Sequence, residues 1–422
     1  MSRTNAESVI AKLAPVLLFA LTAMLVPPAQ AQTYTVIHNF TGGLGGNYPY
    51  DGLTRDRAGN FYGTTNGGGS SDQGAAFKLT NHNGSWIFTL IYSFLGGNDG
   101  ALPYAGLTIG PDGSLYGTTW SGGQGAPQCA GGCGTVYKLT PPAKPCHQTV
   151  CSWTETILYD FYLSSAGLQN PWGGVIFDTA GNIYGATVNG GAGGCPGSGC
   201  GAVYKLTPTK AGWTASVLYS FTGHGDGSIP YCNLLIDSTG NLYGTTLYGA
   251  PYQDYGTVFE LVKSAGGWSE KTLYAFQGGS DGGNPQAGLI MDAAGNLYGG
   301  TTEANGNSLL GVAFELSPSG GGWTYSVISS LSGSLVTDLS FDPAGNLYGT
   351  SPFGGAYGFG YAFKLSDSGS GWTQTDLHDF STQNHGGFGP WSSVAIDPAG
   401  NLYGTTNGGG TKNGGIIWEI TP

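Results

Sequence analysis

The chain has 422 residues, a formal net charge of −12 at pH 7 and only 9% charged residues. Its 13 Lys and Arg residues, against 25 Asp and Glu, argue against a nucleic-acid partner, because binding to a phosphate backbone requires clustered cations. The 79 Gly and 22 Pro residues recur in register between aromatic and β-branched runs, which excludes a disordered chain and indicates regular turns.

Residues 1–31 have the pattern of a secretory signal peptide. Arg3 and Lys12 flank a polar start, and an apolar run covers residues 13–26. Residues 29–31 read Ala-Gln-Ala, a small-x-small cleavage site. The alternative, a membrane anchor, is disfavoured because the apolar run is short for a span. We therefore expect cleavage after Ala31, no membrane span in the mature chain, and a secreted or periplasmic location.

A short hairpin recurs along the rest of the chain. In the clearest copy, residues 290–299, Asp292 can accept hydrogen bonds from the turn backbone and Gly295 supplies the positive φ of a tight turn. Each copy is marked by one tyrosine: Tyr62, Tyr116, Tyr184, Tyr243, Tyr298, Tyr348 and Tyr403. A spacing of roughly 50 to 70 residues between strand-rich units predicts propeller blades.

Six of the seven copies keep the Asp of the turn: Asp56, Asp178, Asp237, Asp292, Asp342 and Asp397. A carboxylate repeated at one fixed place serves the hairpin, so we interpret these residues as turn caps and not as catalytic acids. The second copy instead carries a Pro-Asp-Gly turn at residues 111–113.

Each unit contains four strand-like runs, named A to D in chain order. In the fifth unit they cover residues 288–292, 297–302, 311–317 and 323–331. The last unit lacks a D run, whereas residues 35–40 resemble the D run at residues 375–380. The sequence therefore predicts an all-β fold over residues 32–422. This fold is a seven-bladed β-propeller of four-stranded blades, closed by the N-terminal strand completing the last blade.

Because the four strands of each blade form a meander, successive loops alternate between the two faces of the propeller. The A–B and C–D turns lie on one face, and the B–C loops and D–A links lie on the other. The second face carries the longer, Gly-rich segments and the cysteine insertions. We expect function there, because loops on a rigid scaffold usually carry it.

Seven cysteines suggest a disulfide framework in an exported protein. Six form close pairs in the sequence: Cys129 with Cys133, Cys146 with Cys151, and Cys195 with Cys200. Pairing within each doublet would leave Cys232 unpaired, and the alternative is that one doublet pairs differently, so the connectivity stays open. A metal site is the alternative, and it is disfavoured because the pairs fall in separate blades with only His147 near any of them.

The D–A links repeat a Gly-Gly-x-Asp-Gly pattern or a shortened form of it, with Asp99, Asp226 and Asp281 as the acidic residues. The simpler interpretation is an Asp-Gly turn. The alternative is a weak calcium site, for which each link offers too few carboxylates. We expect no other cofactor.

An aromatic residue follows the proline of the link in five units: Tyr50, Tyr104, Trp172, Tyr231 and Trp391. These residues enter strand A, which we take as the innermost strand, so they are predicted to form a broken ring at the mouth of the central channel. The simpler interpretation is packing between adjacent A strands. The alternative is ligand contact, because aromatic faces stack on sugar rings and other apolar planes.

The repeated motifs carry a family resemblance. The runs G-L-I-x-D-x-x-G-N-L-Y-G, G-x-V-F-x-L and W-x-x-x-x-L-Y-x-F resemble the GloVer tandem repeat over nearly all of residues 33–422. These repeats occur in exported bacterial proteins described as "choice-of-anchor", and the A–B hairpin also resembles that of NHL-type propellers. The resemblance implies export and a propeller-like fold, and it implies no catalytic residue. The chain ends at the closing strand without a sorting segment, so we expect free secretion or a periplasmic location.

We therefore expect a monomeric, non-enzymatic binding or scaffolding propeller, with polysaccharide or a cell-surface protein at the B–C and D–A face. An extracellular enzyme acting on glycans or lactones is the second hypothesis, which rests only on the fold. A protein-interaction platform is the third, and an exposed apolar patch on that face would favour it.

Overall fold

The computed structural model describes residues 32–124, 129, 131–144, 153–161, 167–193, 195, 198–249 and 255–421. The described residues form β-strands, three short 3-10 turns and no α-helix. No helix in these ranges has the length and apolar character that a membrane crossing requires. The predicted signal peptide lies outside the described residues.

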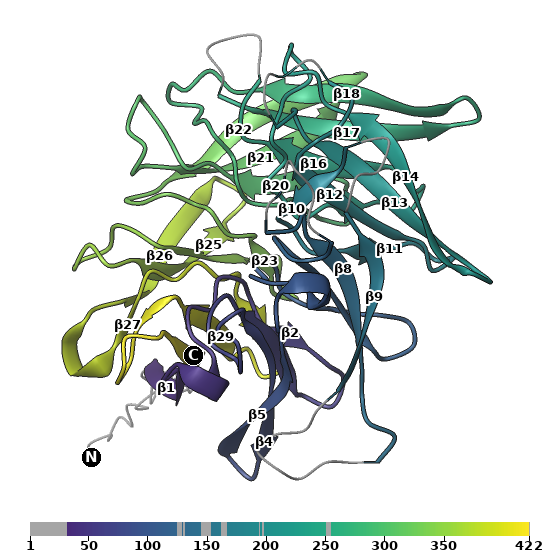
Figure 1. Cartoon of the computed structure of the whole chain (residues 1–422). Helices are drawn as coiled ribbons and strands as arrows, with labels where there is room; N and C mark the ends of the chain where they lie inside the picture. The colour runs from purple at the N-terminus through teal and green to yellow at the C-terminus, as the bar shows by residue number, and fades with distance from the viewer. Residues whose placement is uncertain are drawn as a thin grey trace, which may run out of the picture.

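Seven four-stranded antiparallel sheets form a ring, with strand order A-B-C-D in each (Figure 1). Blade I contains β2 (Thr54–Arg55), β3 (Phe61–Thr65), β4 (Ala75–His82) and β5 (Ser85–Ser93). Blade II contains β6 (Thr108–Ile109), β7 (Leu115–Thr119), β8 (Thr135–Thr140) and β9 (Thr154–Asp160). Blade III contains β11 (Ile176–Phe177), β12 (Ile183–Asn189), β13 (Ala202–Thr209) and β14 (Gly212–Ser220), and β10 (Gln169–Pro171) also pairs with β12.

The second half of the ring repeats this arrangement. Blade IV contains β15 (Leu235–Ile236), β16 (Leu242–Thr246), β17 (Thr257–Ser264) and β18 (Gly267–Ala275). Blade V contains β19 (Ile290–Met291), β20 (Leu297–Gly300), β21 (Val312–Ser319) and β22 (Gly322–Ser330). Blade VI contains β23 (Ser340–Phe341), β24 (Leu347–Ser351), β25 (Tyr361–Asp367) and β26 (Trp372–Asp379).

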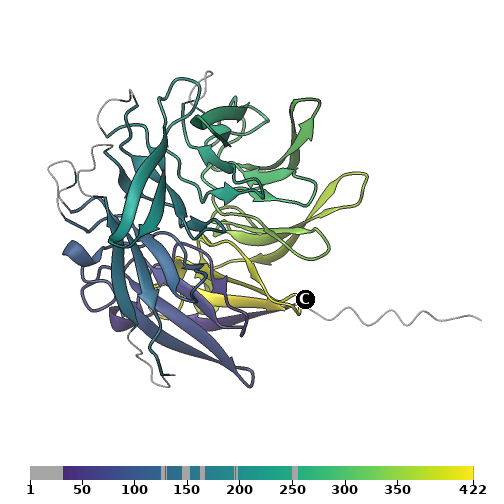
Figure 2. The same ribbon diagram turned by 90° about the vertical axis from the view of Figure 1, so that its right-hand side faces the viewer.

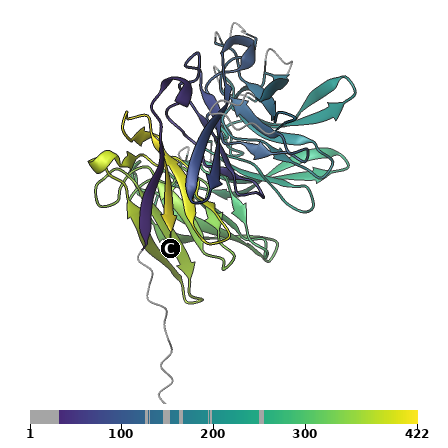
Figure 3. The same cartoon turned by 90° about the horizontal axis from the view of Figure 1, so that it is seen from below.

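Blade VII combines both ends of the chain. It contains β28 (Ala395–Ile396), β29 (Leu402–Thr406), β31 (Ile416–Thr421) and, as its outermost strand, β1 (Thr33–Asn39). The pairing runs from Thr33 opposite Thr421 to Asn39 opposite Ile416, with a bulge after Val36. Figures 2 and 3 show the purple N-terminal strand against the yellow C-terminal strands. The predicted closure by the N-terminal strand is confirmed, as is the seven-bladed fold.

Two short elements complete the fold on the loop face. The strands β27 (Gly387–Phe388) and β30 (Gly408–Gly409) pair outside the blades. The D–A links also bridge to the B–C loops of the next blade, for example Asn47 with Gly67 and Ala101 with Ser121. Links and B–C loops therefore lie on one face, as the meander predicts.

The hydrophobic core lies between neighbouring blades. One cluster joins Phe61 and Phe77 of blade I to Tyr403 and Ile417 of blade VII. The glycine in the Tyr-Gly of each strand B makes this packing possible. A Cβ on Gly117 would lie 2.5 Å from the Tyr137 hydroxyl, so only glycine lets the large strand C side chain cross the sheet there.

In five of the seven blades, the threonine that follows the Tyr-Gly of strand B also bonds to the next blade. The Thr118 hydroxyl donates to the Gly173 carbonyl at 2.9 Å, and the Thr245 hydroxyl donates to the Ala287 carbonyl at 2.8 Å. These buried hydrogen bonds reach the backbone that enters the next strand A. They fix the positions of the innermost strands, and a neutral buried bond of this kind contributes about 1 kcal/mol.

The repeated Asp residues are turn caps, as predicted. Asp292 Oδ1 accepts from the backbone N–H groups of Ala294 and Asn296, both at 2.9 Å. Its Oδ2 accepts from the Asn296 side chain at 2.8 Å and from the Tyr298 hydroxyl at 3.2 Å. The same set of contacts surrounds Asp56, Asp178, Asp237, Asp342 and Asp397.

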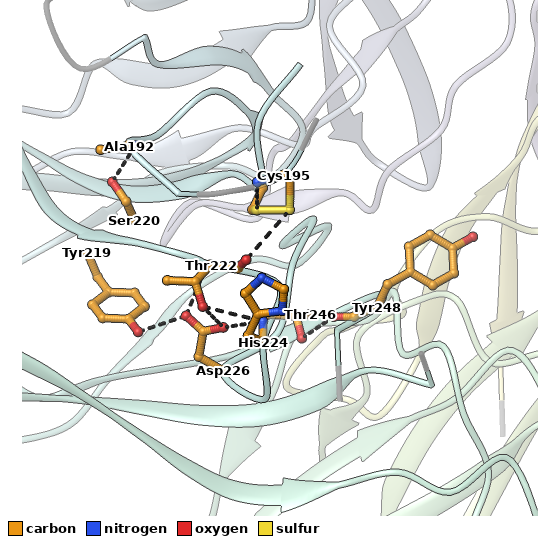
Figure 4. The surroundings of a disulfide bond; sticks show 10 residues. Ala192, Cys195, Tyr219, Ser220, Thr222, His224, Asp226, Thr246 and Tyr248 are labelled. Atoms are coloured by element: carbon orange, nitrogen blue, oxygen red, sulfur yellow. Dashed lines mark hydrogen bonds between the residues drawn. A yellow bond between two sulfur atoms is a disulfide. The ribbon is translucent and has the colours of Figure 1, made fainter. Parts of the chain in front are cut away.

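Two of the predicted disulfides are present. Cys129 pairs with Cys133, and Cys195 pairs with Cys200 next to the link that begins at Thr222 (Figure 4). Cys232 is buried and forms no disulfide, which decides a point that the sequence left open. The predicted pair of Cys146 and Cys151 lies outside the described residues.

The first prediction concerns ring closure. A chain that begins at Thr41 lacks β1 and exposes the edge of β31, so we expect its melting temperature to fall by about 5–10 °C and the protein to self-associate. A chain that begins at Gln32 is the control. Calorimetry and size-exclusion chromatography measure both effects.

A synthetic peptide of residues 32–40 should restore the melting temperature of the shortened chain, because it can add a strand to the free edge. A scrambled peptide of the same composition is the control. Equal stability of the two chains without peptide would contradict the closing role of β1.

Candidate functional site: the mouth of the central channel

Each strand A approaches the axis of the ring, and the residues just before it line a pocket at the channel mouth. The pocket has a cavity volume of about 60 Å³. Its lining comes from all seven blades: Tyr50, Asp51, Tyr104, Trp172, Gly173, Tyr231, Asn233, Gln286, Val336, Thr337, Asp338 and Trp391. The link prolines and the threonine bonds between blades position this lining.

The five predicted aromatic residues lie side by side in this lining, and we call them the aromatic arc: Tyr50, Tyr104, Trp172, Tyr231 and Trp391. Tyr104 stacks on Trp172 with ring centroids 4.4 Å apart, and Trp172 meets Tyr231 edge-on at 4.7 Å. Tyr50 contacts Tyr104 at 5.2 Å and Trp391 at 6.0 Å. Gln286 and Val336 occupy the gap, so the predicted broken ring is present. Ligand contact by the arc stays a prediction.

Two further aromatic side chains extend the arc outwards. Trp120, in the B–C loop after β7, meets Trp172 edge-on at 5.6 Å. Phe353, in the B–C loop after β24, lies 5.9 Å from Trp391. Sequence reasoning missed both, because they belong to loops that share no motif with the links.

Below the arc lie three polar side chains that we call the channel floor: Asp51, Asn233 and Asp338. Asp51 and Asn233 also line a second cavity of about 190 Å³, which continues along the A strands towards residues 54 and 108. The channel floor therefore separates the mouth from the rest of the channel.

Asp51 joins blade I to blade II. Its two carboxylate oxygens accept hydrogen bonds from the backbone N–H groups of Gly52, at 2.5 Å, and Gly106, at 2.6 Å. These N–H groups face the axis of the ring, so a side chain on the channel floor satisfies them.

Asp338 and Asn233 join the four blades III to VI. Asp338 accepts from the Gly288 N–H at 2.6 Å and from the Asn233 side-chain amide at 2.8 Å. The carbonyl oxygen of the Asn233 side chain accepts from the Gly174 N–H at 2.7 Å. The channel floor thus consists of two hydrogen-bonded groups, one around Asp51 and one around Asn233 and Asp338.

The channel floor is electrostatically unusual. Burial raises the pKa of Asp51 to about 6, helped by the nearby Asp338 and opposed by the N–H groups of Gly106 and Gly52. Burial also raises the pKa of Asp338, against the hydrogen bonds from Asn233 and Gly288. No lysine, arginine or histidine is among the described residues that line the two cavities.

Sequence reasoning also missed the channel floor, although a signal exists. The second and third positions after the link proline are small residues in most blades, such as Ala105 and Gly106 in blade II. Asp51 breaks that pattern at the second position and Asn233 at the third. Asp338 takes the equivalent third position in blade VI, where Leu335 replaces the link proline.

The three acidic residues of the links lie away from the mouth and close their own turns. Asp226 accepts from the Tyr219 hydroxyl at 2.9 Å and from the Thr222 N–H at 2.8 Å (Figure 4). Asp281 makes the equivalent contacts with Tyr274 and Gln277, and Asp99 with Tyr92 and Leu95. Within the described ranges no three His, Cys, Asp or Glu residues gather as a metal site. Calcium at these links stays a prediction.

The face around the mouth is also the apolar face of the molecule. Nine of the eleven exposed large hydrophobic residues in the described ranges belong to links or B–C loops: Leu44, Tyr48, Leu95, Tyr248, Leu309, Leu310, Phe353, Tyr357 and Phe359. Only Ile87 and Val327 lie elsewhere, on D strands. This distribution supports a contact surface on the predicted face.

The second prediction tests the buried acid of the channel floor. Unfolded Asp has a pKa of about 3.9, so the native state binds more protons at Asp51 between about pH 4 and 6. The stability that protonated Asp51 provides is complete below pH 4 and is lost as pH rises through 6. The Asp51→Asn variant lacks this pH-dependent loss of stability. The difference in unfolding free energy, variant minus unmodified chain, should therefore increase by roughly 2 kcal/mol from pH 4 to 7.

Denaturant unfolding at several pH values measures this difference. Asp367→Asn, at the exposed end of β25 and outside the channel, is the matched control. A flat difference for Asp51→Asn would show that Asp51 titrates normally.

Comparisons with solved structures find proteins with a similar fold. A fungal alcohol oxidase of the AA5 family, in complex with copper, matches with a TM-score of 0.56 and 12% identity over 93% of this chain and 77% of that one. PorZ of Porphyromonas gingivalis, a surface component of the type-IX secretion system, matches with a TM-score of 0.50 and 14% identity over 89% of this chain and 47% of that one.

A protein of Bacteroides uniformis with a provisional 6-phosphogluconolactonase assignment matches with a TM-score of 0.49 and 15% identity over 84% of this chain and 89% of that one. At such identities the likeness concerns the fold alone. No curated protein matches the chain.

The repeat itself is specific. A family model described as the Gloeobacter/Verrucomicrobia repeat matches residues 22–161 and 126–340, which confirms the resemblance inferred from the motifs. Because these matches span more than half of the sequence, the chain belongs to the Gloeobacter/Verrucomicrobia repeat family.

Proposed function

We propose that this chain is an exported, non-enzymatic binding propeller that contacts polysaccharide through the aromatic arc. The observation that supports the proposal is the continuous run of five partly exposed aromatic rings around one opening. Tyrosine and tryptophan combine an apolar face with a polar edge, which suits contact with a sugar ring in water. Two disulfides in the described residues agree with an oxidising compartment outside the cytoplasm.

The size of the pocket determines how such a ligand would bind. A cavity of about 60 Å³ holds only a few water molecules and excludes a whole sugar ring. The glycan would therefore lie across the mouth, with its rings against the exposed faces of Trp172 and Trp391. This geometry favours recognition over turnover, because the polymer backbone stays above the acids.

An enzyme acting on glycans or lactones is the second candidate, and the channel floor favours it. An acid such as Asp51, with its pKa raised to about 6, could serve as a proton donor near neutral pH. The two acids, however, already accept hydrogen bonds from backbone and amide donors, and they lie beneath a narrow mouth. We therefore rank binding first.

A protein-interaction platform is the third candidate. It is supported by the exposed hydrophobic side chains of the B–C loops, such as Leu309 and Tyr357, which are 55% and 56% exposed. These side chains lie outside the aromatic arc, so a protein partner and a glycan would depend on different residues.

The third prediction tests glycan binding. Titration calorimetry of the mature chain against a panel of polysaccharides, with and without a calcium chelator, should find saturable binding without release of reducing sugar. Trp172→Ala and Trp391→Ala should each weaken the affinity about tenfold, because each removes a stacking face worth roughly 1 kcal/mol or more. Tyr357→Ala, on the same face but outside the arc, is the matched control.

Each other result has a defined meaning. Sugar release in the same samples would replace the binding function by an enzymatic one. Loss of binding with chelator would support calcium at the links. Absence of binding across the panel would overturn the glycan proposal in favour of a protein partner.

A further inference from the structure

We propose that the aromatic arc and the channel floor together form a receptor for an organic ammonium group, so that the preferred glycan is a polymer of amino sugars with free amines. This inference rests on the proposed function, because it concerns the ligand class of the same mouth. It goes beyond that function by assigning Asp51 and Asp338 to recognition.

The first argument is charge balance. Asp51 and Asp338 line one small pocket without a cationic side chain, and burying a carboxylate is costly unless a positive partner offsets its charge. The two ion pairs found among the described residues are Lys138 with Asp112 and Lys271 with Glu260, which lie on strands C and D and in an A–B turn. The channel floor therefore carries a negative potential at the mouth that no cationic side chain in the lining offsets.

The second argument is the chemistry of the walls. The faces of tryptophan and neutral tyrosine attract cations through the ring quadrupole, and such cages bind alkylammonium groups. Burial raises the pKa of Tyr50 and Tyr231, so both phenols are neutral at physiological pH and add no competing charge. Aromatic walls above an acidic floor are complementary to a cation that also has an apolar body.

The third argument is size. A cavity of about 60 Å³ accepts an ammonium head group but not a sugar ring. A glycan with an amine on each ring could place one amine towards Asp51 and Asp338 while its rings stack on the arc. A neutral glycan would leave the acids without a partner.

A metal ion fits this pocket less well. Calcium takes six to eight oxygen ligands, whereas each floor carboxylate already accepts two N–H donors within 2.8 Å. Five of the lining residues are aromatic and supply no strong oxygen ligand to a metal. An ammonium group instead needs only the remaining lone pairs and the ring faces.

The decisive experiment compares two ligands that differ in charge. Titration calorimetry at pH 6.5 should show glucosamine hexamers binding the mature chain at least about tenfold more tightly than N-acetylglucosamine hexamers of equal length. Asp51→Asn and Asp338→Asn should each reduce this preference to less than about threefold, while Asp367→Asn leaves it unchanged. Circular dichroism establishes that the variants are folded.

A second measurement needs no variant. Tetramethylammonium carries a charge that does not depend on pH, so the pH dependence of its binding reports the protein alone. Its affinity should fall at least threefold between pH 7.5 and 5, as Asp51 takes up a proton. The other titratable groups in the lining are Asp338, Tyr50, Tyr104 and Tyr231. Burial raises the pKa of Tyr50 and Tyr231 further above that range. The neutral isostere tert-butanol is the control.

The outcomes separate this inference from the proposed function. Equal affinity for both hexamers, lost in Trp172→Ala, would overturn the ammonium receptor and keep glycan binding. Tighter binding of an oligolysine than of the glucosamine hexamer would overturn the amino-sugar assignment. Displacement of tetramethylammonium by equimolar calcium would identify a metal site instead, and absence of binding by every probe would overturn both proposals.

Discussion

No blade of this protein can bury its own hydrophobic surface. Each sheet is apolar on both faces, and its core side chains complete their packing only against the neighbouring blades, as Phe61 and Phe77 do with Tyr403 and Ile417. A linear array of such sheets would expose two apolar faces at its ends. Pairing of β1 with β31 removes both ends at once, so the stability of every blade depends on the closure of one ring.

Closure creates a second requirement at the centre of the ring. The innermost strands have one unpaired edge each, and their N–H groups face the channel, where they need acceptors. Asp51, Asn233 and Asp338 provide these acceptors, and they connect six blades in doing so. The same side chains give the mouth its negative potential. The channel floor therefore both satisfies the backbone of the innermost strands and determines the charge of the ligands that the mouth prefers.

The repeats made most of the fold predictable. The Asp-x-x-Gly-Asn-x-Tyr hairpin predicts strands A and B, and the displaced D run at residues 35–40 predicts the closing strand, because both patterns recur in equivalent places. The aromatic arc was predictable for the same reason, since each ring follows a link proline. The pairing of Cys195 with Cys200 followed from sequence proximity alone.

The rest of the site could not be predicted in this way. Asp51 and Asp338 occur once each, at positions where the other blades hold other residues, so no repetition marks them. Trp120 joins the arc through the path of a B–C loop, which no motif describes. Residues that recur in every blade stabilise the blade itself. The residues of a site shared by the whole ring occur only once, so a repeat pattern does not reveal them.

The position of β1 has a consequence for how the molecule is made. Thr33 is among the first described residues to be synthesised, and its partner Thr421 is among the last. Contacts of such sequence separation form late, because a long loop must first be closed. The ring therefore cannot acquire its final stability until β31 has been synthesised. Until then a chain with this topology stays open and accessible to the machinery that handles unfolded chains.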